Sequence, residues 1–213
     1  MKLMQEMRLQ AECNSFTPDD YYVRRATLFD RLQPSPLDIV MIGDSLINGC
    51  EWHELLGNPH IKNRGINGDT VCGVRQRLEP VMAGAPRQLF IMVGINDVSH
   101  NLSAEAIAHN IIALADDAHS LSPTTALYIH SLLPFDTAIH YTSLQAKEGV
   151  VIEINRLLQN EAIHHNYTYI DLYSHFVKPH SNIIQPQYTN DGLHLTGEGY
   201  ELWRTLLAPY IHP

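Results

Sequence analysis

Residues 39–42 form a short apolar run that is mostly β-branched and ends in a polar, glycine-containing turn, and further short stretches of strand-like residues follow along this chain. Such runs are typical of strands that are buried on both faces of a parallel sheet. The fourth stretch is expected to end at Pro134, because proline has no N–H to donate to a neighbouring strand. The pattern predicts five strands, at residues 39–42, 61–66, 89–94, 126–133 and 167–172.

Between these runs, apolar residues recur at the three- and four-residue spacing of amphipathic helices. Ser103 and Thr196 precede two such stretches and are the hydroxyl residues expected to cap them. Shorter or uncapped helices are predicted near residues 52–56 and 150–158. Strands and helices therefore alternate along the chain, and this alternation predicts a parallel sheet with right-handed crossovers and helices on both faces.

Two further helices are predicted from their start signals. Thr17 is followed by a proline and two aspartates, which predicts a helix that is capped by Thr17 and runs to about Leu32. A single helix is expected over residues 71–81, with Asp69 or Thr70 as its N-cap. The whole chain, 1–213, is expected to form one α/β domain, with residues 1–36 as an N-terminal helical segment packed on it.

Composition narrows the classes of function. The chain of 213 residues has 45% apolar and 17% charged residues, as expected for one folded domain. Its net charge of -9 argues against nucleic-acid binding and against attraction to anionic membranes. No membrane span and no signal peptide are visible, so a cytoplasmic location is the default, with a periplasmic or exported one if a signal has been removed. Its 13 histidines form no metal-ligand pattern, and no metal is expected.

Polar residues follow the first three predicted strands. Ser45 follows the first strand, Gly68 the second and Asn96, in an expected polar turn at 94–97, the third. The carboxyl ends of parallel strands meet at one edge of the sheet, where open α/β sheets bind their ligands. The loop before the last helix adds Asp191 and His194 to the same edge.

These residue types match the needs of acyl transfer. A serine hydroxyl such as that of Ser45 is a weak nucleophile until a base such as His194 takes its proton. Asp191 can fix the tautomer of the histidine and stabilise the imidazolium ion. The backbone N–H groups of Ser45 and Gly68 and the side-chain amide of Asn96 can bind the oxyanion of the tetrahedral intermediate.

Each element taken alone has a structural explanation. Ser45 can be a helix N-cap, Asn96 a turn residue, and the Asp191–His194 spacing an ordinary surface loop. The nucleophile elbow of α/β-hydrolases is absent, because Ile47 stands where that motif has its second glycine. The four elements in this order, all at strand ends, favour a catalytic site over these separate explanations.

Taken together, the four blocks resemble the SGNH hydrolases of the GDSL lipase and esterase superfamily. The matching blocks are residues 43–46, 65–70, 94–97 and 191–194. This resemblance implies a three-layer α/β/α flavodoxin-like sandwich with a five-stranded parallel sheet in the order 2-1-3-4-5. It also implies a Ser45-His194-Asp191 triad, an oxyanion hole formed by Ser45, Gly68 and Asn96, and no metal or organic cofactor.

Three further segments resemble the catalytic subunits of platelet-activating-factor acetylhydrolase Ib and their bacterial esterase relatives. They are residues 52–55, residues 68–70 with Arg77 and Leu78 downstream, and residues 193–200. This closer resemblance implies a preference for short acyl groups. The pocket is expected to be shaped by the segments 134–148 and 173–190, whose sequences indicate no particular ligand.

The leading hypothesis is a serine esterase that removes a short acyl group, acetyl in the first instance, from an alcohol oxygen such as that of an O-acetylated sugar. The alternative within the enzymes is a lysophospholipase or thioesterase acting on longer acyl chains. An alternative from another class is a non-catalytic flavodoxin-like binding module. The expected partner is a small-molecule ester, and a homodimer is left open.

Overall fold

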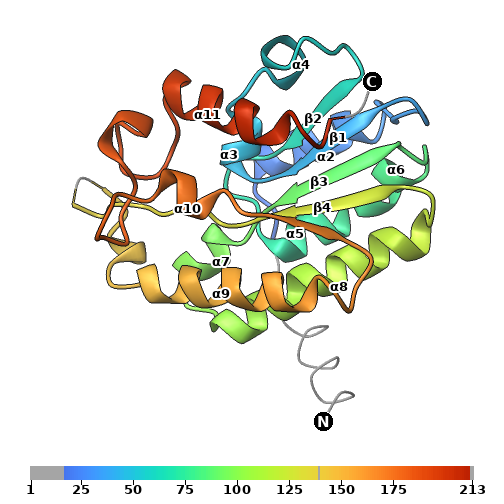
Figure 1. Ribbon diagram of the computed structural model, residues 1–213. Helices are drawn as coiled ribbons and strands as arrows, with labels where there is room; N and C mark the ends of the chain where they lie inside the picture. Colours follow the sequence, from blue (N-terminus) through green and yellow to red (C-terminus); the bar gives the residue numbers. More distant parts are fainter. Residues whose placement is uncertain (1–16, 139, 212–213) are drawn as a thin grey trace.

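The computed structural model describes residues 17–138 and 140–211, in which a central sheet lies between two layers of helices (Figure 1). All neighbouring strands are parallel, and the strand order is β2-β1-β3-β4-β5. The strands are β1 Ile39–Gly43, β2 Ile61–Gly65, β3 Gln88–Met92, β4 Ala126–His130 and β5 Thr168–Ile170. The predicted α/β class and strand order are therefore confirmed.

The central strands are the most deeply buried part of the chain. Every residue of β1 and β3 is buried, as expected for strands covered on both faces. At the end of β1, a Cβ atom on Gly43 would lie 1.8 Å from the carbonyl oxygen of Met92, its register partner in β3. Any larger residue at position 43 would push the two strands apart, directly before the turn that carries Ser45.

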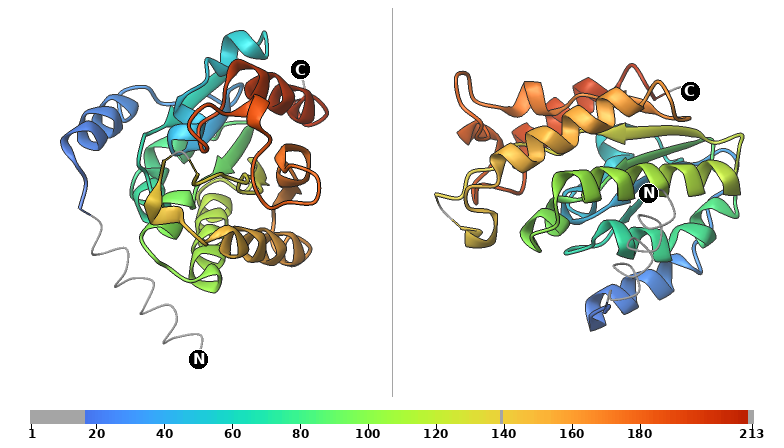
Figure 2. Two further views of the ribbon diagram at one scale, coloured as in Figure 1. Left: turned by 90° about the vertical axis from the view of Figure 1, so that its left-hand side faces the viewer. Right: turned by 90° about the horizontal axis from the view of Figure 1, so that it is seen from below.

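The helices divide between the two faces of the sheet (Figures 1 and 2). The first face is covered by α3 Ser45–Asn48, α4 Trp52–Leu55 and α11 Gly197–Leu207. The second is covered by α5 Val71–Gln76, α6 Leu78–Met82, α7 Ile95–Ser99, α8 Ala104–Leu121 and α9 Glu148–Glu161. On the first face the rings of Trp52 and Trp203 meet edge to face, with centroids 4.9 Å apart, which joins α4 to α11.

The predicted caps of two long helices are confirmed, and that of the N-terminal helix is not. Ser103 and Thr196 accept hydrogen bonds from backbone amides of α8 and α11. The N-terminal helix, α2 Asp20–Phe29, is capped by Asp19 rather than Thr17, because the Asp19 carboxylate accepts the Tyr22 amide. This helix ends at Phe29, short of the predicted end. Residues 1–16 of the predicted N-terminal segment lie outside the described residues.

The single helix predicted over residues 71–81 is two helices, α5 and α6. Thr70 caps the first, through the Gly73 amide. Pro80 explains the break, because it has no N–H to offer the Gln76 carbonyl and its ring would clash there. Arg77 lies at the break with φ -111° and ψ 15°, and its buried side chain turns inward.

The remaining differences concern the segments that follow strands. Residues 94–97, expected as a turn, contain the start of helix α7. Strand β4 ends at His130 rather than near Leu133, because the backbone N–H and C=O of Leu132 bind the side chain of Asn155 instead of a neighbouring strand. The loops contain three short helices, η1 Thr142–Leu144, α10 Tyr173–Phe176 and η2 Pro186–Tyr188.

Candidate active site

The turns after the first three strands converge on one cavity of about 550 Å³. Ser45 is the first residue of α3, Gly68 lies between β2 and α5, and Asn96 lies in the first turn of α7. His194 reaches the same cavity from the loop before α11. The other lining residues are Asn48, Gly49, Asn67, Ile95, Ser99, Tyr141, Ser143, Leu144, Leu193, Leu195 and Tyr200.

Ser45, His194 and Asp191 form a continuous hydrogen-bonded chain. Ser45 Oγ lies 2.9 Å from His194 Nε2, and His194 Nδ1 lies 2.7 Å from Asp191 Oδ2. The serine and the histidine are separated by 149 positions in the sequence, and the fold brings them together at the carboxyl edge of the sheet. A neutral imidazole in this position can accept the serine proton at Nε2 while Nδ1 donates to the carboxylate.

Hydrogen bonds stabilise the ionised form of Asp191. Partial burial raises the pKa of its carboxyl group, but hydrogen bonds from His194, from the backbone amides of Leu193 and His194, and from Tyr141 together lower the pKa well below its ordinary value. The two amide bonds go to Oδ1 at 2.9 and 2.8 Å, which leaves Oδ2 for the imidazole. Asp191 is therefore a carboxylate throughout the neutral pH range.

Tyr141 contacts Asp191 and His194, although the sequence does not indicate it as a site residue. Its hydroxyl group donates to Asp191 Oδ2 at 2.9 Å and lies 3.1 Å from His194 Nδ1. It belongs to the irregular segment after β4, where no motif or periodicity marks individual positions. The only available signal is a tyrosine in a segment already expected to shape the pocket.

Two of the predicted oxyanion donors, Gly68 and Asn96, line the cavity and differ in their surroundings. A Cβ atom on Gly68 would meet nothing within 4 Å, so this residue faces open space. The side-chain amide of Asn96 donates to the backbone carbonyl of Asp69 at 2.8 Å. An amide nitrogen carries two hydrogens, so this bond orients the group and leaves a second N–H for another acceptor.

Buried carboxyl groups lie beneath these turns. Burial, followed by the nearby charges of Asp69 and Asp97, raises the pKa of the Asp44 carboxyl group to about 7. Asp44 Oδ1 accepts the Leu46 amide at 3.0 Å, whereas no residue in the described ranges binds Oδ2. The environment of the Asp44 carboxyl group therefore disfavours its charged form.

Arg77 ties the ends of the first two strands together. Its guanidinium group binds Asp69 Oδ2 through Nε at 2.9 Å and Nη2 at 2.7 Å. It also donates to the carbonyl groups of Gly43, at the end of β1, and Arg64, in β2. Burial raises the pKa of Asp69 to about 6, although the charge of Arg77 acts in the opposite direction. This buried ion pair fixes the loop on which Gly68 lies.

Residues 41–202 match the model of the GDSL-like Lipase/Acylhydrolase family. The chain belongs to this family. The matched range contains the turns with Ser45, Gly68 and Asn96 and the loop with Asp191 and His194, so the resemblance inferred from the four blocks is confirmed at the level of the family.

The individual proteins that are similar to this chain match different shares of its length. Platelet-activating factor acetylhydrolase IB subunit alpha1 of Rattus norvegicus is 32% identical over 123 residues, which are 56% of this chain and 52% of the relative. The chain thus spans about half the length of this curated relative. A GDSL-like lipase from Bacteroides thetaiotaomicron has the same fold, with a TM-score of 0.75, 24% identity and coverage of 89% of this chain and 96% of that one.

A third similar protein is an acetyl-xylooligosaccharide esterase from Geobacillus Stearmophilus, whose structure is that of a mutant form. Its TM-score is 0.66 at 17% identity, and the match covers 83% of this chain and 94% of the other. At this identity the similarity concerns the fold alone. The fold of the GDSL family is therefore shared with proteins whose names describe different activities.

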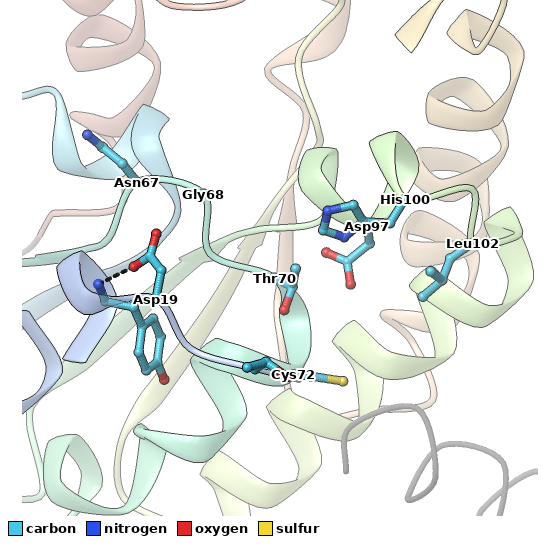
Figure 3. A pocket seen from close by; sticks show the side chains of 10 residues that line it. Asp19, Asn67, Gly68, Thr70, Cys72, Asp97, His100 and Leu102 are labelled. Atoms are coloured by element: carbon cyan, nitrogen blue, oxygen red, sulfur yellow. Dashed lines mark hydrogen bonds between the residues drawn. The ribbon is translucent and has the colours of Figure 1, made fainter. Parts of the chain in front are cut away.

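A second cavity, of about 390 Å³, adjoins the first and shares Asn67 and Gly68 with it (Figure 3). Its walls come from the start of α2, the loop before α5 and the end of α7, and they include the carboxylates of Asp19 and Asp97. Ser45, His194 and Asp191 line no part of it. Of these two cavities, Ser45 lines the one of about 550 Å³.

Two negative observations apply to residues 17–138 and 140–211. Within these ranges, no group of three or more histidine, cysteine, aspartate or glutamate side chains is arranged to hold a metal ion. Over the same part of the chain, no helix combines the length and the apolar character needed to cross a bilayer.

Proposed function

We propose that this GDSL family member is a serine esterase that hydrolyses short-chain esters, acetyl esters in the first place, through an acyl-enzyme. The observation that carries the proposal is the hydrogen-bonded chain from Ser45 through His194 to Asp191, which ends in a cavity open to a substrate. The family match and the relatives named for acetyl hydrolysis support the same activity.

In the first half of the reaction, Ser45 Oγ attacks the ester carbonyl carbon while His194 Nε2 takes the hydroxyl proton. The carbonyl oxygen becomes negative, and the candidate donors for it are the N–H groups of Ser45 and Gly68 and the second N–H of the Asn96 amide. The bond to the alcohol oxygen then breaks, and the imidazolium of His194 gives its proton to the leaving alcohol. The product is an acyl-serine at position 45.

In the second half, water enters the place of the alcohol. His194 takes a proton from the water, the resulting hydroxide attacks the acyl carbon, and the oxyanion forms again beside the same donors. The bond to Ser45 Oγ breaks, and the serine recovers its proton from His194. The carboxylate of Asp191 stabilises the imidazolium in both halves, since its lowered pKa keeps it ionised.

The walls of the cavity favour a polar leaving group. Amides and hydroxyls of Asn48, Asn67, Ser99, Ser143 and Tyr200 line it and can bind the hydroxyl groups of a sugar. Apolar side chains at positions 95, 144, 193 and 195 are interspersed with them, which suits a short acyl group better than a long chain. We therefore propose O-acetylated carbohydrate as the substrate class, which is also the class in the name of the Geobacillus esterase.

The test is hydrolysis of a series of p-nitrophenyl esters, from acetate through butyrate to decanoate, by the wild type and by Ser45→Ala. We expect the highest kcat/KM on acetate and release of acetate from acetylated xylooligosaccharides. A maximum on decanoate would favour the lysophospholipase or thioesterase alternative instead. Absence of turnover on every ester, combined with a flavin absorbance spectrum in the purified protein, would support the binding-module alternative.

A further inference from the structure

Tyr141 reaches the candidate triad from a segment that belongs to no strand or long helix. It directly precedes η1, and its backbone lies in the left-handed region, with φ 62° and ψ 54°. This region is disfavoured for residues other than glycine, so the surrounding structure must hold the residue there. Non-glycine residues in this region occur often at functional sites, which directs attention to the contacts of the side chain.

The hydroxyl group of Tyr141 completes a triangle of polar atoms. Its oxygen lies 2.9 Å from Asp191 Oδ2 and 3.1 Å from His194 Nδ1, while these two atoms are 2.7 Å apart. Burial, and then the hydrogen bond to Asp191, raises the pKa of the phenol to about 12, so it keeps its proton at neutral pH. The contact of 2.7 Å between Asp191 Oδ2 and His194 Nδ1 needs a hydrogen on Nδ1, because a carboxylate cannot donate, so the single phenol hydrogen goes to Asp191 Oδ2.

This arrangement fixes the tautomer of the histidine. Since the phenol hydrogen points at Asp191, both atoms that face His194 Nδ1 offer lone pairs. Nδ1 must then carry the ring hydrogen, and Nε2 is left without one. The unprotonated Nε2 is the atom that faces Ser45 Oγ at 2.9 Å, as a general base requires.

The segment that carries Tyr141 is anchored on both sides of the cavity. Towards α7, Lys147 Nζ donates to the carbonyl groups of Val98 and Ser99, at 2.8 and 3.3 Å. Towards the triad loop, the Asp136 amide donates to the carbonyl of Gly192 at 2.7 Å. Tyr141 thus lies between two anchored residues, Asp136 and Lys147, and these anchors keep its hydroxyl group next to the carboxylate of Asp191.

We propose that Tyr141 is a positioning residue of the proposed esterase, which orients the Asp191 carboxylate and thereby keeps His194 in the tautomer that activates Ser45. The inference rests on the proposed function, because its effect is read through ester hydrolysis. Activity of the wild type in the same assay keeps a failure of this inference distinct from a failure of the proposed function.

The test compares Tyr141→Phe in two backgrounds, the wild type and Asp191→Asn, on p-nitrophenyl acetate. In the wild type we expect kcat to fall on the order of tenfold, the typical effect of one lost hydrogen bond to a charged group, with KM changed less than about twofold. In Asp191→Asn, whose carboxylate is already absent, the same substitution should change kcat by less than about twofold. The rate of labelling by a fluorophosphonate should follow kcat.

Tyr173→Phe is the matched control, since it removes a hydroxyl that donates to the carbonyl of Asn182 at 3.4 Å, away from the candidate triad. Thermal melts show whether each variant is folded. An unchanged kcat in a folded Tyr141→Phe overturns the proposal. An equal loss of kcat in both backgrounds also overturns it, because Tyr141 would then act independently of Asp191.

Discussion

The candidate active site has two sides that are positioned by different physical means. One side consists of the strand-end turns, residues 43–45, 66–70 and 93–97, which follow β1, β2 and β3. The other consists of the returning loops, residues 134–147 and 189–196, which carry the tyrosine, the aspartate and the histidine of the site. Pairing between the strands positions these turns, because Gly43 at the end of β1 is the register partner of both Gly65 in β2 and Met92 in β3.

The returning loops have no ladder of strand pairing to define them. Single backbone contacts hold them instead, together with bonds in which backbone amides donate to side-chain oxygens. Asp191 Oδ1 accepts two such amides, and Thr189 Oγ1 accepts the Gly192 amide. The two sides also differ in their carboxyl groups, since Asp44 is buried and Asp191 is partly exposed and well hydrogen-bonded. The strand-end side therefore contains a fully buried carboxyl group, whereas the carboxyl group of the returning loops is partly exposed and held by polar contacts.

The largest expected effect is on the strand-end side. Ser45→Ala should abolish ester turnover and fluorophosphonate labelling, because no other hydroxyl group faces His194 Nε2 in the described part of the chain. The melting temperature should change little, since the serine side chain is only partly buried. Ser120→Ala, on the exposed face of α8, is the control. Full activity in Ser45→Ala would contradict the proposal that Ser45 is the nucleophile.

The next effect is on the loop side. Asp191→Asn should lower kcat by up to about 10⁴-fold, by analogy with other serine triads, because an amide cannot stabilise the imidazolium. The asparagine oxygen can still accept the amides of Leu193 and His194, so the loop should keep its shape and the protein its melting temperature. His194→Ala should be at least as inactive. Near-normal kcat in Asp191→Asn would show that the loop side orients the histidine by other means.

Asn96→Ala tests whether the strand-end side stabilises the oxyanion. If the second amide N–H is a donor in the transition state, kcat should fall by about 10²–10³, or about 2.7–4 kcal/mol, with KM little changed. Loss of the bond to the Asp69 carbonyl should lower the melting temperature by only a few degrees. A lowered melting temperature with a normal kcat would leave Asn96 as a purely structural residue.

The smallest expected effect concerns the buried carboxyl group of Asp44, on the strand-end side. The ordinary pKa of aspartate, about 3.9, is raised to about 7 here, so between these pH values the folded chain holds a proton that the unfolded chain has lost. Unfolding releases that proton, and the free energy of unfolding falls as the pH rises through this window, by at most about 4 kcal/mol.

Asp44→Asn removes this dependence, because asparagine cannot ionise but can still accept the Leu46 amide. At pH 8 the variant should melt above the wild type, on the order of 5 °C, and near pH 4 the gain should vanish. Asp136→Asn, which removes another carboxylate that caps a backbone amide, controls for the loss of one charge. A gain that is equal at both pH values would contradict the assignment of the buried proton to Asp44.

The sequence predicts the strand-end side better than the loop side. The apolar runs mark β1 and β3 because both faces of these strands are buried, and the parallel order then brings Ser45, Gly68 and Asn96 to one edge. Predictions are wrong where a local contact competes with periodicity. Pro80 divides a helix whose apolar spacing is continuous, and Asn155 ends strand β4 early by binding Leu132.

On the loop side, only the residues of the Asp191–His194 motif could be predicted from the sequence. Asp191 and His194 are three residues apart, so their pairing is local, and the spacing alone indicates it. Tyr141 lies 50 positions from Asp191, in a left-handed backbone conformation that no residue preference reveals. Its place is determined by anchors at both ends of its segment, and such anchors exist only in the folded chain.

The contact between Asp136 and Gly192 has a consequence for loop exchange between relatives. A Cβ atom on Gly192 would lie 1.9 Å from the Asp136 carbonyl oxygen, and the backbone there has φ 90°, which glycine alone adopts readily. The two returning loops therefore form one structural unit, although they are well separated in the sequence. A chimera that receives residues 134–147 without residues 189–196 should lose the geometry of both loops. A chimera that receives both loops together should keep the shape of the pocket.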